Sequence, residues 1–291
     1  MKSGENRKGY YFTSPWLITL LIFWLFPLLY SLFLSFYSID IITGEGFFVG
    51  LGNYIRLFSD PDFLAALKNT TIFVVGTIPF TTILALIAAI ALNSKFPLSN
   101  FFKSALVIPS ITSMVVMALI FSNLYASGGY IGMLIKLVGL APPENGLLLS
   151  EKTALASIMI MDILIAFGYY MLLYLAALQN IPQNQYEAAE LDGAKFLDKF
   201  FHITLPHLKP ITLFILIINT IRSFQIFVEI FVMTKGGPLN STITAVYYVY
   251  DAGFVKFKIG YASAAAYILF IIIAVFSIVQ LKLFGGERKT V

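Results

Sequence analysis

Long apolar runs alternate with short polar segments along the whole chain. Six of the runs extend over about twenty residues, which is the length of an α-helix that spans the hydrocarbon core of a bilayer. The pattern therefore predicts an all-α polytopic membrane protein with six transmembrane helices, in which residues 1–291 form one transmembrane domain. The expected spans cover about residues 16–37, 69–92, 104–125, 153–179, 211–234 and 261–284.

Prolines interrupt the first three runs. Pro27, Pro79 and Pro109 each remove a backbone donor, so we expect kinks in these helices. The first run is too long for the apolar region of a signal peptide and lacks a small-residue cleavage site. We therefore expect it to remain as a membrane helix.

Composition supports this interpretation and excludes other classes of protein. Apolar residues make up 59% of the chain and charged residues 12%, against roughly a quarter charged in soluble domains. The net charge of +4 comes without a basic block, so we expect no nucleic-acid partner. The absence of cysteine excludes disulfides and thiolate metal sites.

One polar segment, YEAAELDGAKFLDKFFHITLPHLKP at residues 186–210, separates two long apolar runs. Such a segment gains nothing in lipid and is expected in water or against a partner. Glu187–Ala189 favour a short helix that ends at Gly193, since glycine readily adopts the left-handed conformation. A second short helix is expected to stop at Leu205 and Pro206, with the next apolar run beginning near Pro210.

This segment resembles the EAA loop of bacterial ATP-binding-cassette importer permeases, most closely those for sugars. The resemblance rests on eleven residues at the family spacing: Glu187, Ala188, Ala189, Asp192, Gly193, Ala194, Phe200, Ile203, Leu205, Pro206 and Pro210. Further matching motifs are Asn53-Tyr54, Leu57-Phe58, Phe63, Asn69-Thr70, Gly236-Gly237-Pro238 and Gly260–Ala264.

The resemblance implies a transmembrane permease subunit that translocates carbohydrate delivered by an extracytoplasmic solute-binding protein. It further implies a second permease subunit, with a heterodimer favoured, and two ATPase subunits on the cytoplasmic face. The loop at residues 180–210 would carry a coupling helix that docks on an ATPase subunit. The implied docking residues are Tyr186, Glu187, Ala188, Ala189, Asp192, Gly193 and Ala194.

The chain itself has no motif for nucleotide chemistry. It lacks the G-x-x-x-x-G-K-[ST] phosphate loop, so we expect ATP and Mg²⁺ to be used by the ATPase partners and no cofactor to be bound here. Catalytic and metal sites are likewise not expected. His202 and His207 lie five residues apart in the polar segment, but no further ligands cluster there, and interface contacts are the expected role.

The distribution of Lys and Arg predicts the orientation in a bacterial cytoplasmic membrane. Eleven of these residues fall in the segments on the side of the termini and the EAA-like loop, and seven fall in the opposite segments. The positive-inside rule then places both termini and the loop in the cytoplasm.

Ionisable and amide side chains inside an apolar span are costly and suggest function. The expected substrate-pathway residues are Asp162, Tyr170, Asn219, Arg222, Gln225, Phe227 and Glu229. Four of them form a polar stripe on the fifth expected helix. The alternative is a polar contact between helices or subunits. Two roles are possible for Arg222: it recognises an anionic substrate, or it forms an internal ion pair with Asp162 or Glu229.

Two other functions remain open at this point. An ion-gradient-driven secondary sugar transporter would need coupling-ion sites, for which Asp162 and Glu229 are the available carboxylates. An intramembrane enzyme would need catalytic motifs, and neither paired catalytic carboxylates nor a nucleophile elbow occurs in the sequence.

Overall fold

A computed structural model describes residues 12–39, 45–93 and 97–284 of the chain. The chain divides into two compact units. One comprises Met1–Leu64 and Tyr248–Phe270, and the other comprises Ala65–Tyr247 and Ile271–Val291. Three helices have residues in both units: α4 (Pro61–Asn93), α13 (Ala245–Tyr250) and α14 (Ile259–Phe284).

The first unit begins with an apolar helix, Phe12–Ser35, that is long enough to cross a membrane. It contains a π-helical turn, η1 (Leu21–Leu25), which ends two residues before Pro27. A wider turn at this point relieves the clash between a proline ring and the preceding turn. The elements that follow η1 in this unit are α2 (Phe26–Ser35), the antiparallel strands β1 (Tyr37–Ile39) and β2 (Gly46–Phe48), α3 (Gly52–Phe58) and η4 (Asp251–Val255).

A glycine allows α14 to approach the end of α2 within this unit. A Cβ atom on Gly260 would lie 1.9 Å from the carbonyl oxygen of Tyr37. Further along α14, the hydroxyl of Tyr267 donates to the carbonyl of Leu28 at 2.5 Å. The Gly260–Ala264 motif therefore has a packing role, because only glycine fits at its first position.

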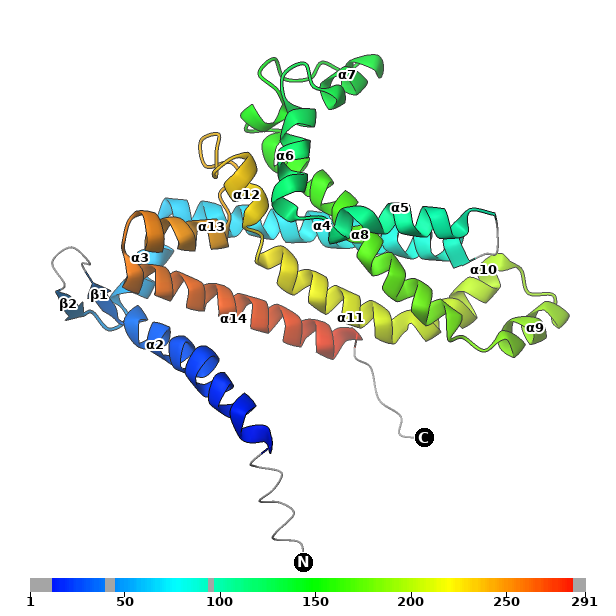
Figure 1. Ribbon diagram of the computed structural model, residues 1–291, viewed down its shortest axis with the longest axis horizontal. Coiled ribbons are helices and arrows are strands. Elements are labelled where there is room, and N and C mark those ends of the chain that lie inside the picture. The colour runs from blue at the N-terminus through cyan, green and yellow to red at the C-terminus, as the bar shows by residue number, and fades with distance from the viewer. Residues whose placement is uncertain (1–11, 40–44, 94–96, 285–291) are drawn as a thin grey trace, which may run out of the picture. The chain divides into compact units, whose positions relative to one another are not determined.

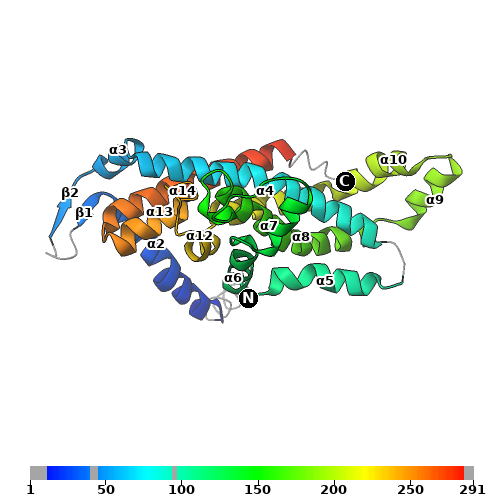
Figure 2. The same ribbon diagram turned by 90° about the horizontal axis from the view of Figure 1, so that it is seen from above.

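The named elements of the second unit are all helices, joined by turns and loops (Figures 1 and 2). In it, α5 and α11 pack against α8, and α6 packs against α12. Besides its parts of α4, α13 and α14, its elements are α5 (Ser99–Ile111), α6 (Met114–Tyr125), α7 (Tyr130–Leu137), η2 (Leu147–Leu149), α8 (Ala154–Gln179), α9 (Gln183–Leu191), α10 (Phe196–Lys199), η3 (Phe200–Thr204), α11 (Leu205–Phe224) and α12 (Val228–Met233).

Helix α8 is the centre of the second unit. Within its most apolar stretch 56% of the residues are buried, compared with 22% for α14. Tyr170, Met171 and Tyr174 of α8 pack with Leu208 and Ile215 of α11 in one apolar cluster. The other helices expose large apolar side chains, as expected for surfaces that face lipid or another subunit rather than water.

Among the described residues, five helices are long and apolar enough to cross a membrane, and a bent pair makes a sixth. This agrees with the six predicted spans. The third predicted span, residues 104–125, is not one straight helix, because α5 and α6 meet at 98°. The chain leaves the helical conformation at Thr112 and Ser113, so the bend that Pro109 suggested lies three residues after it.

The second predicted span is longer than expected. Helix α4 has 33 residues and begins at Pro61, eight residues before the predicted start. Asp62 and Lys68 lie in its first turns and interrupted the apolar run in the sequence. The helix also continues through Pro79 without a break in its assignment.

Close packing of α5 on α8 predicts that Gly168 does not tolerate a side chain. A Cβ atom at this position would lie 1.9 Å from the Leu106 carbonyl oxygen and 2.8 Å from its carbon. Because these are backbone atoms, Gly168→Ala should separate the helices and lower the free energy of unfolding by about 3 kcal/mol. Thermal unfolding of the purified protein in detergent measures this effect.

Gly132→Ala is the matched control. No atom lies within 4 Å of the new Cβ, and alanine is the better helix former by about 1 kcal/mol. We expect the thermal unfolding midpoint of Gly132→Ala to be unchanged or raised. If the midpoint of Gly168→Ala were unchanged as well, the proposed contact would be contradicted.

Candidate functional site

The residues of the EAA-like loop form a short surface helix after α8. Helix α9 covers Gln183–Leu191 and, together with α10, lies beyond the C-terminal end of α8 (Figures 1 and 2). Glu187 and Ala188 are exposed, whereas Tyr186 and Ala189 are half-buried. The helix was predicted from the sequence, but it begins four residues before the Glu-Ala-Ala triplet.

Gly193 turns the chain at the end of α9. Its φ of +79° lies in the left-handed region, as the sequence predicted. Its N–H donates to the carbonyl of Glu190 at 3.0 Å, and the N–H of Ala194 donates to the carbonyl of Ala189 at 2.9 Å. The last carbonyls of the helix are thereby satisfied. Asp192, at the C-cap, is exposed.

Two side-chain contacts hold α9 on the following helical run. The Tyr186 hydroxyl and Thr204 Oγ1 lie 2.8 Å apart, and Thr204 is 8% exposed. Lys199 Nζ forms an ion pair with Glu190 Oε1 at 2.7 Å, but the Glu190 side chain is 62% exposed. Exposed ion pairs contribute little to stability, so the partly buried Tyr186–Thr204 contact is the stronger anchor.

The second part of the loop continues directly into a membrane-length helix. Helices α10, η3 and α11 follow one another without a gap from Phe196 to Phe224. The predicted stop at Leu205 and Pro206, and the predicted new start near Pro210, are therefore wrong. The π-helical turn η3 already removes backbone groups from the regular hydrogen-bond pattern, so the missing N–H of Pro206 costs little there.

The two histidines of this run do not approach a third ligand. Nδ1 of His202 lies 2.9 Å from the carbonyl oxygen of Asp198, and Nδ1 of His207 lies 2.7 Å from that of Ile203. Within the described part of the chain, no group of three or more potential metal ligands occurs.

The predicted polar stripe is broken, because the helix that carries it ends. Helix α11 stops at Phe224 and α12 starts at Val228, with non-helical backbone angles at Gln225 and Phe227. Glu229 therefore does not continue the face of Asn219 and Arg222, and the single-stripe prediction is wrong. The freed carbonyl of Ile226 accepts a hydrogen bond from Thr244 at 3.2 Å. Such compensation is what makes a break tolerable at membrane depth.

An ion pair joins α8 to α11 just before the break. Both terminal nitrogens of Arg222 donate to the Asp162 carboxylate, at 2.5 and 3.3 Å. A Glu229 oxygen lies 4.0 Å from the same guanidinium. The side chain of Asp162 is 3% exposed and that of Arg222 is 34% exposed. The structure thus realises the internal ion pair that the sequence offered as one of two roles for Arg222.

The break, the ion pair and an aromatic ring enclose a small cavity. It has a volume of about 220 Å³ and is lined by Asp162, Arg222, Gln225, Phe227 and Glu229, among others. Five of the seven predicted pathway residues are therefore brought together. Small-molecule sites have volumes of about 300 Å³ or more, so this conformation does not hold an oligosaccharide.

The two remaining pathway candidates do not line this cavity. Tyr170 is 2% exposed and belongs to the apolar cluster around α8. Asn219 is fully buried, and its Oδ1 accepts a hydrogen bond from Ser223 at 3.4 Å. Ser223 in turn lies 3.5 Å from Thr77 of α4. The Asn219 hydrogen bond therefore stays within α11, and it is Ser223 that makes the polar contact between α11 and α4.

One polar cluster was missed in the sequence. Oδ2 of Asp60 accepts hydrogen bonds from the hydroxyls of Tyr248 and Tyr261, at 2.6 and 3.0 Å. Oδ1 accepts from the backbone of Asp62 and Phe63 at the start of α4. Burial raises the pKa of Asp60, but these hydrogen bonds outweigh it and hold the pKa below its usual value. The Asp60-Pro61 dipeptide before an apolar run was the available signal, because it is typical of a helix N-cap.

Curated relatives share most of the chain's length. The lactose transport system permease protein of Rhizobium radiobacter is 36% identical over 99% of this chain and 97% of its own length. An arabinooligosaccharides transport system permease protein of Bacillus subtilis is 37% identical over 98% of this chain and 91% of its own length.

Solved structures share the fold. A chain of a bacterial ABC transporter involved in the import of the acidic polysaccharide alginate superposes with a TM-score of 0.85. The match covers 99% of this chain and 100% of that one at 20% identity. At this identity the likeness establishes the polytopic helical fold alone.

The family model for the binding-protein-dependent transport system inner membrane component matches residues 81–284. This range includes the α9 turn, the continuous run from Phe196 to Phe224 and the Arg222–Asp162 ion pair. With most of the chain matched and full-length relatives above 30% identity, the chain belongs to the family of binding-protein-dependent transport system inner membrane components.

Proposed function

We propose that this chain is a permease subunit of an ATP-driven carbohydrate importer and that α9 couples it to an ATPase subunit. The observation that carries the coupling is the exposure of apolar side chains on α9 and on the adjoining α10, which begins the long helical run to Phe224. Leu191 at the end of α9 is 90% exposed, and Phe196 and Leu197 are 66% and 62% exposed. Exposed apolar groups beside charged ones suit a partner's cleft.

The anchor of α9 gives a route for movement. A displacement of α9 acts on Thr204 through the Tyr186 hydroxyl. Thr204 belongs to the uninterrupted run that ends at Phe224, next to Arg222 and the helix break. The long helical run from Phe196 to Phe224 therefore links the α9 contact to the ion pair. Discontinuous helices typically form the substrate and ion sites of transporters.

Energy has to come from partner subunits. The chain has no phosphate loop, so ATP and Mg²⁺ are assigned to two ATPase subunits and no cofactor to this chain. A second permease subunit, in a heterodimer, completes the pathway. Both termini and α9 face the cytoplasm, and the chain crosses the bacterial cytoplasmic membrane several times.

Carbohydrate is the proposed substrate class. The relatives carry lactose and arabinooligosaccharides in their names. A structural neighbour was solved with an alginate pentasaccharide-bound periplasmic protein. We therefore assign delivery to an extracytoplasmic solute-binding protein. In the pathway, Gln225 and Glu229 offer hydrogen-bonding groups and Phe227 offers a flat surface for sugar C–H groups.

A secondary transporter fits the structure less well. Asp162 was one of two carboxylates available to bind a coupling ion, but it is engaged on both oxygens by Arg222. The same bidentate contact occupies the guanidinium that would recognise an anionic substrate. Family membership also favours the ATP-driven class.

Substitutions of Gly193 test the coupling role of the α9 turn. Gly193→Pro removes the N–H that bonds to Glu190 and cannot adopt a φ of +79°. We expect uptake and co-purification of the ATPase subunits to fall by tenfold or more, while the subunit still inserts in the membrane. Gly193→Asn is the control, because asparagine tolerates the left-handed conformation. Normal uptake with Gly193→Pro would rule out the coupling role.

Substitutions at the Arg222–Asp162 ion pair distinguish its contribution to the stability of the fold from its contribution to transport. Asp162→Asn leaves the Arg222 charge with only the more distant Glu229, so the free energy of unfolding should fall by about 2–3 kcal/mol. This is at the low end for buried pairs because Arg222 is partly exposed. Thermal unfolding in detergent provides the measurement.

The double variant Asp162→Leu with Arg222→Met removes both charges and should recover most of that stability. Its uptake should remain below a tenth of the wild-type rate if the pair contributes to the pathway. Full recovery of both stability and uptake would assign the pair a purely structural role.

A further inference from the structure

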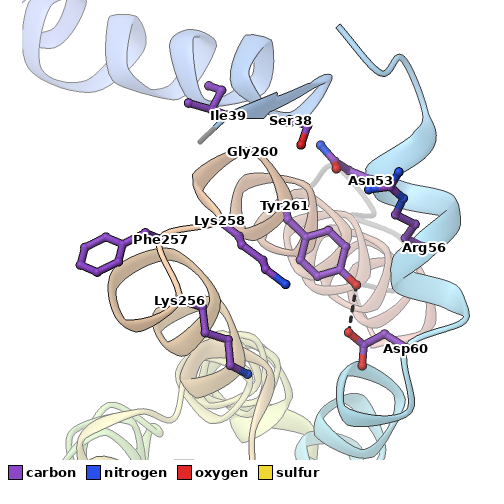
Figure 3. Close-up of a pocket in the computed structure, with 10 residues that line it drawn as sticks. All are labelled: Ser38, Ile39, Asn53, Arg56, Asp60, Lys256, Phe257, Lys258, Gly260 and Tyr261. Atoms are coloured by element: carbon purple, nitrogen blue, oxygen red, sulfur yellow. Dashed lines mark hydrogen bonds between the residues drawn. The ribbon is translucent and has the colours of Figure 1, made fainter. Parts of the chain in front are cut away.

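A second, larger cavity lies in the first unit, between β1, α3 and the start of α14 (Figure 3). Its volume is about 530 Å³. Arg56 enters from α3, and Lys256 and Lys258 enter from the segment before α14. Asp60 is the one acidic residue among the described lining residues. None of these residues belongs to the coupling helix or to the ion-pair cavity.

The acidic groups that the structure describes around this cavity are already engaged. The Asp60 carboxylate accepts four hydrogen bonds, two from tyrosines and two from backbone N–H groups. The nearby Asp251 pairs with Lys256 at 2.6 Å, and this hydrogen bond raises the pKa of Lys256. Asp62 lies close enough to act on Lys256 as well and has contacts of its own.

The basic groups are not all engaged. Within the described part of the chain, neither Arg56 nor Lys258 has an ion pair with a carboxylate within 4.0 Å, and both are exposed. Figure 3 shows the Lys258 ammonium beside the Tyr261 ring, with the Arg56 side chain on the other side of that ring in this view. Among the described residues the cavity therefore presents two cations that lack an ion-pair partner, which an anion would complement.

The position along the chain puts these cations at the boundary of the membrane. Helix α4 begins at Pro61 and α14 begins at Ile259, and both are long enough to span it. Arg56 and Lys258 precede these starts by a few residues, which is the level of lipid headgroups. In the predicted six-span topology both helix starts follow outside segments, so the proposed orientation puts these cations in the outer leaflet.

Exposed apolar side chains surround the cations. Ile55 and Phe58 flank Arg56 on α3 and are 66% and 61% exposed, and Phe254 and Phe257 are 74% and 53% exposed. A docking site for a soluble acidic protein would have a polar rim. A rim of aromatic and aliphatic groups beside Lys and Arg is typical of the zone where acyl chains meet phosphates.

We propose that this cavity binds the phosphate group of an anionic phospholipid, with Arg56 and Lys258 contacting the phosphate and the apolar rim contacting the acyl chains. Lys256 contributes through the hydrogen-bonding positions that Asp251 leaves unused. The leaflet rests on the orientation in the proposed function, whereas the binding chemistry does not. Asp60 stays turned to Tyr248 and Tyr261 and shapes the floor of the cavity.

Titration of the purified transporter complex with phosphatidylglycerol, followed by native mass spectrometry, tests the proposal. The double variant Arg56→Gln with Lys258→Gln should bind this lipid about tenfold more weakly than wild type, from the loss of two cations near the headgroup. The matched control is Lys68→Gln with Lys152→Gln, two exposed lysines outside the cavity, and it should bind like wild type. Arg56→Lys alone, which keeps the charge, should retain most of the binding.

Three outcomes would overturn the proposal. Equal binding by all variants would exclude this site. Displacement of the lipid by millimolar inorganic phosphate would assign the cavity to a free anion. Unchanged lipid binding with lost docking of the solute-binding protein would assign it to that partner. ATPase co-purification is measured on the same samples, so a failure of the lipid site is distinguishable from a failure of α9 coupling.

Discussion

The hydrocarbon core of a membrane offers no hydrogen-bond partners, and this constraint explains most of the polar contacts in the chain. Arg222 would be unstable there alone, and its bidentate contact with Asp162 neutralises it while fixing α11 against α8. The helix break that follows is possible because Thr244 satisfies a freed carbonyl. Charge neutralisation and backbone compensation therefore occur within a few residues of each other, and together they define the cavity.

The same constraint explains why α9 and α11 work as one part. The polar residues of the EAA-like loop cannot enter lipid, yet the run from Phe196 to Phe224 enters it without interruption. The π-helical turn η3 lies between these two parts, and there Thr204 contacts the Tyr186 hydroxyl. A helix that stopped at Pro206 would have separated the surface contact from the ion pair by a flexible joint. The unbroken run makes the proposed coupling contact and the ion-pair cavity mechanically dependent on each other.

Much of this arrangement could be predicted from the sequence, and the failures share a cause. Apolar runs located the spans, and the left-handed turn at Gly193 followed from its residue type. Hydrophobicity does not record backbone direction. Pro109 indicated a kink in the third span but not a bend of 98°, and the apolar pattern did not indicate the break at Gln225. The predicted helix end at Pro206 was wrong, because the π-helical turn before it already departs from the regular hydrogen-bond pattern and the missing N–H of proline costs little there. The Arg222–Asp162 pair was anticipated as one option, but choosing it required the distance between two helices.

The motif residues also show why a resemblance needs a structure beside it. Asn53 belongs to the motif in the first outer segment, and its amide donates to the carbonyls of Ser35 and Tyr37 at 2.9 Å each. Asn69 does the same for Asn240 and Ile243, at 3.0 Å each. Both amides donate to carbonyls where the chain leaves a regular element. Their positions in the motif therefore reflect the need to hydrogen-bond these backbone carbonyls rather than contact with a substrate. Arg56, three residues from Asn53, matches no part of the motif and is left exposed with its charge. Within one short helix, the residue that fits the family pattern maintains the fold, and the residue outside the pattern is the one available to bind.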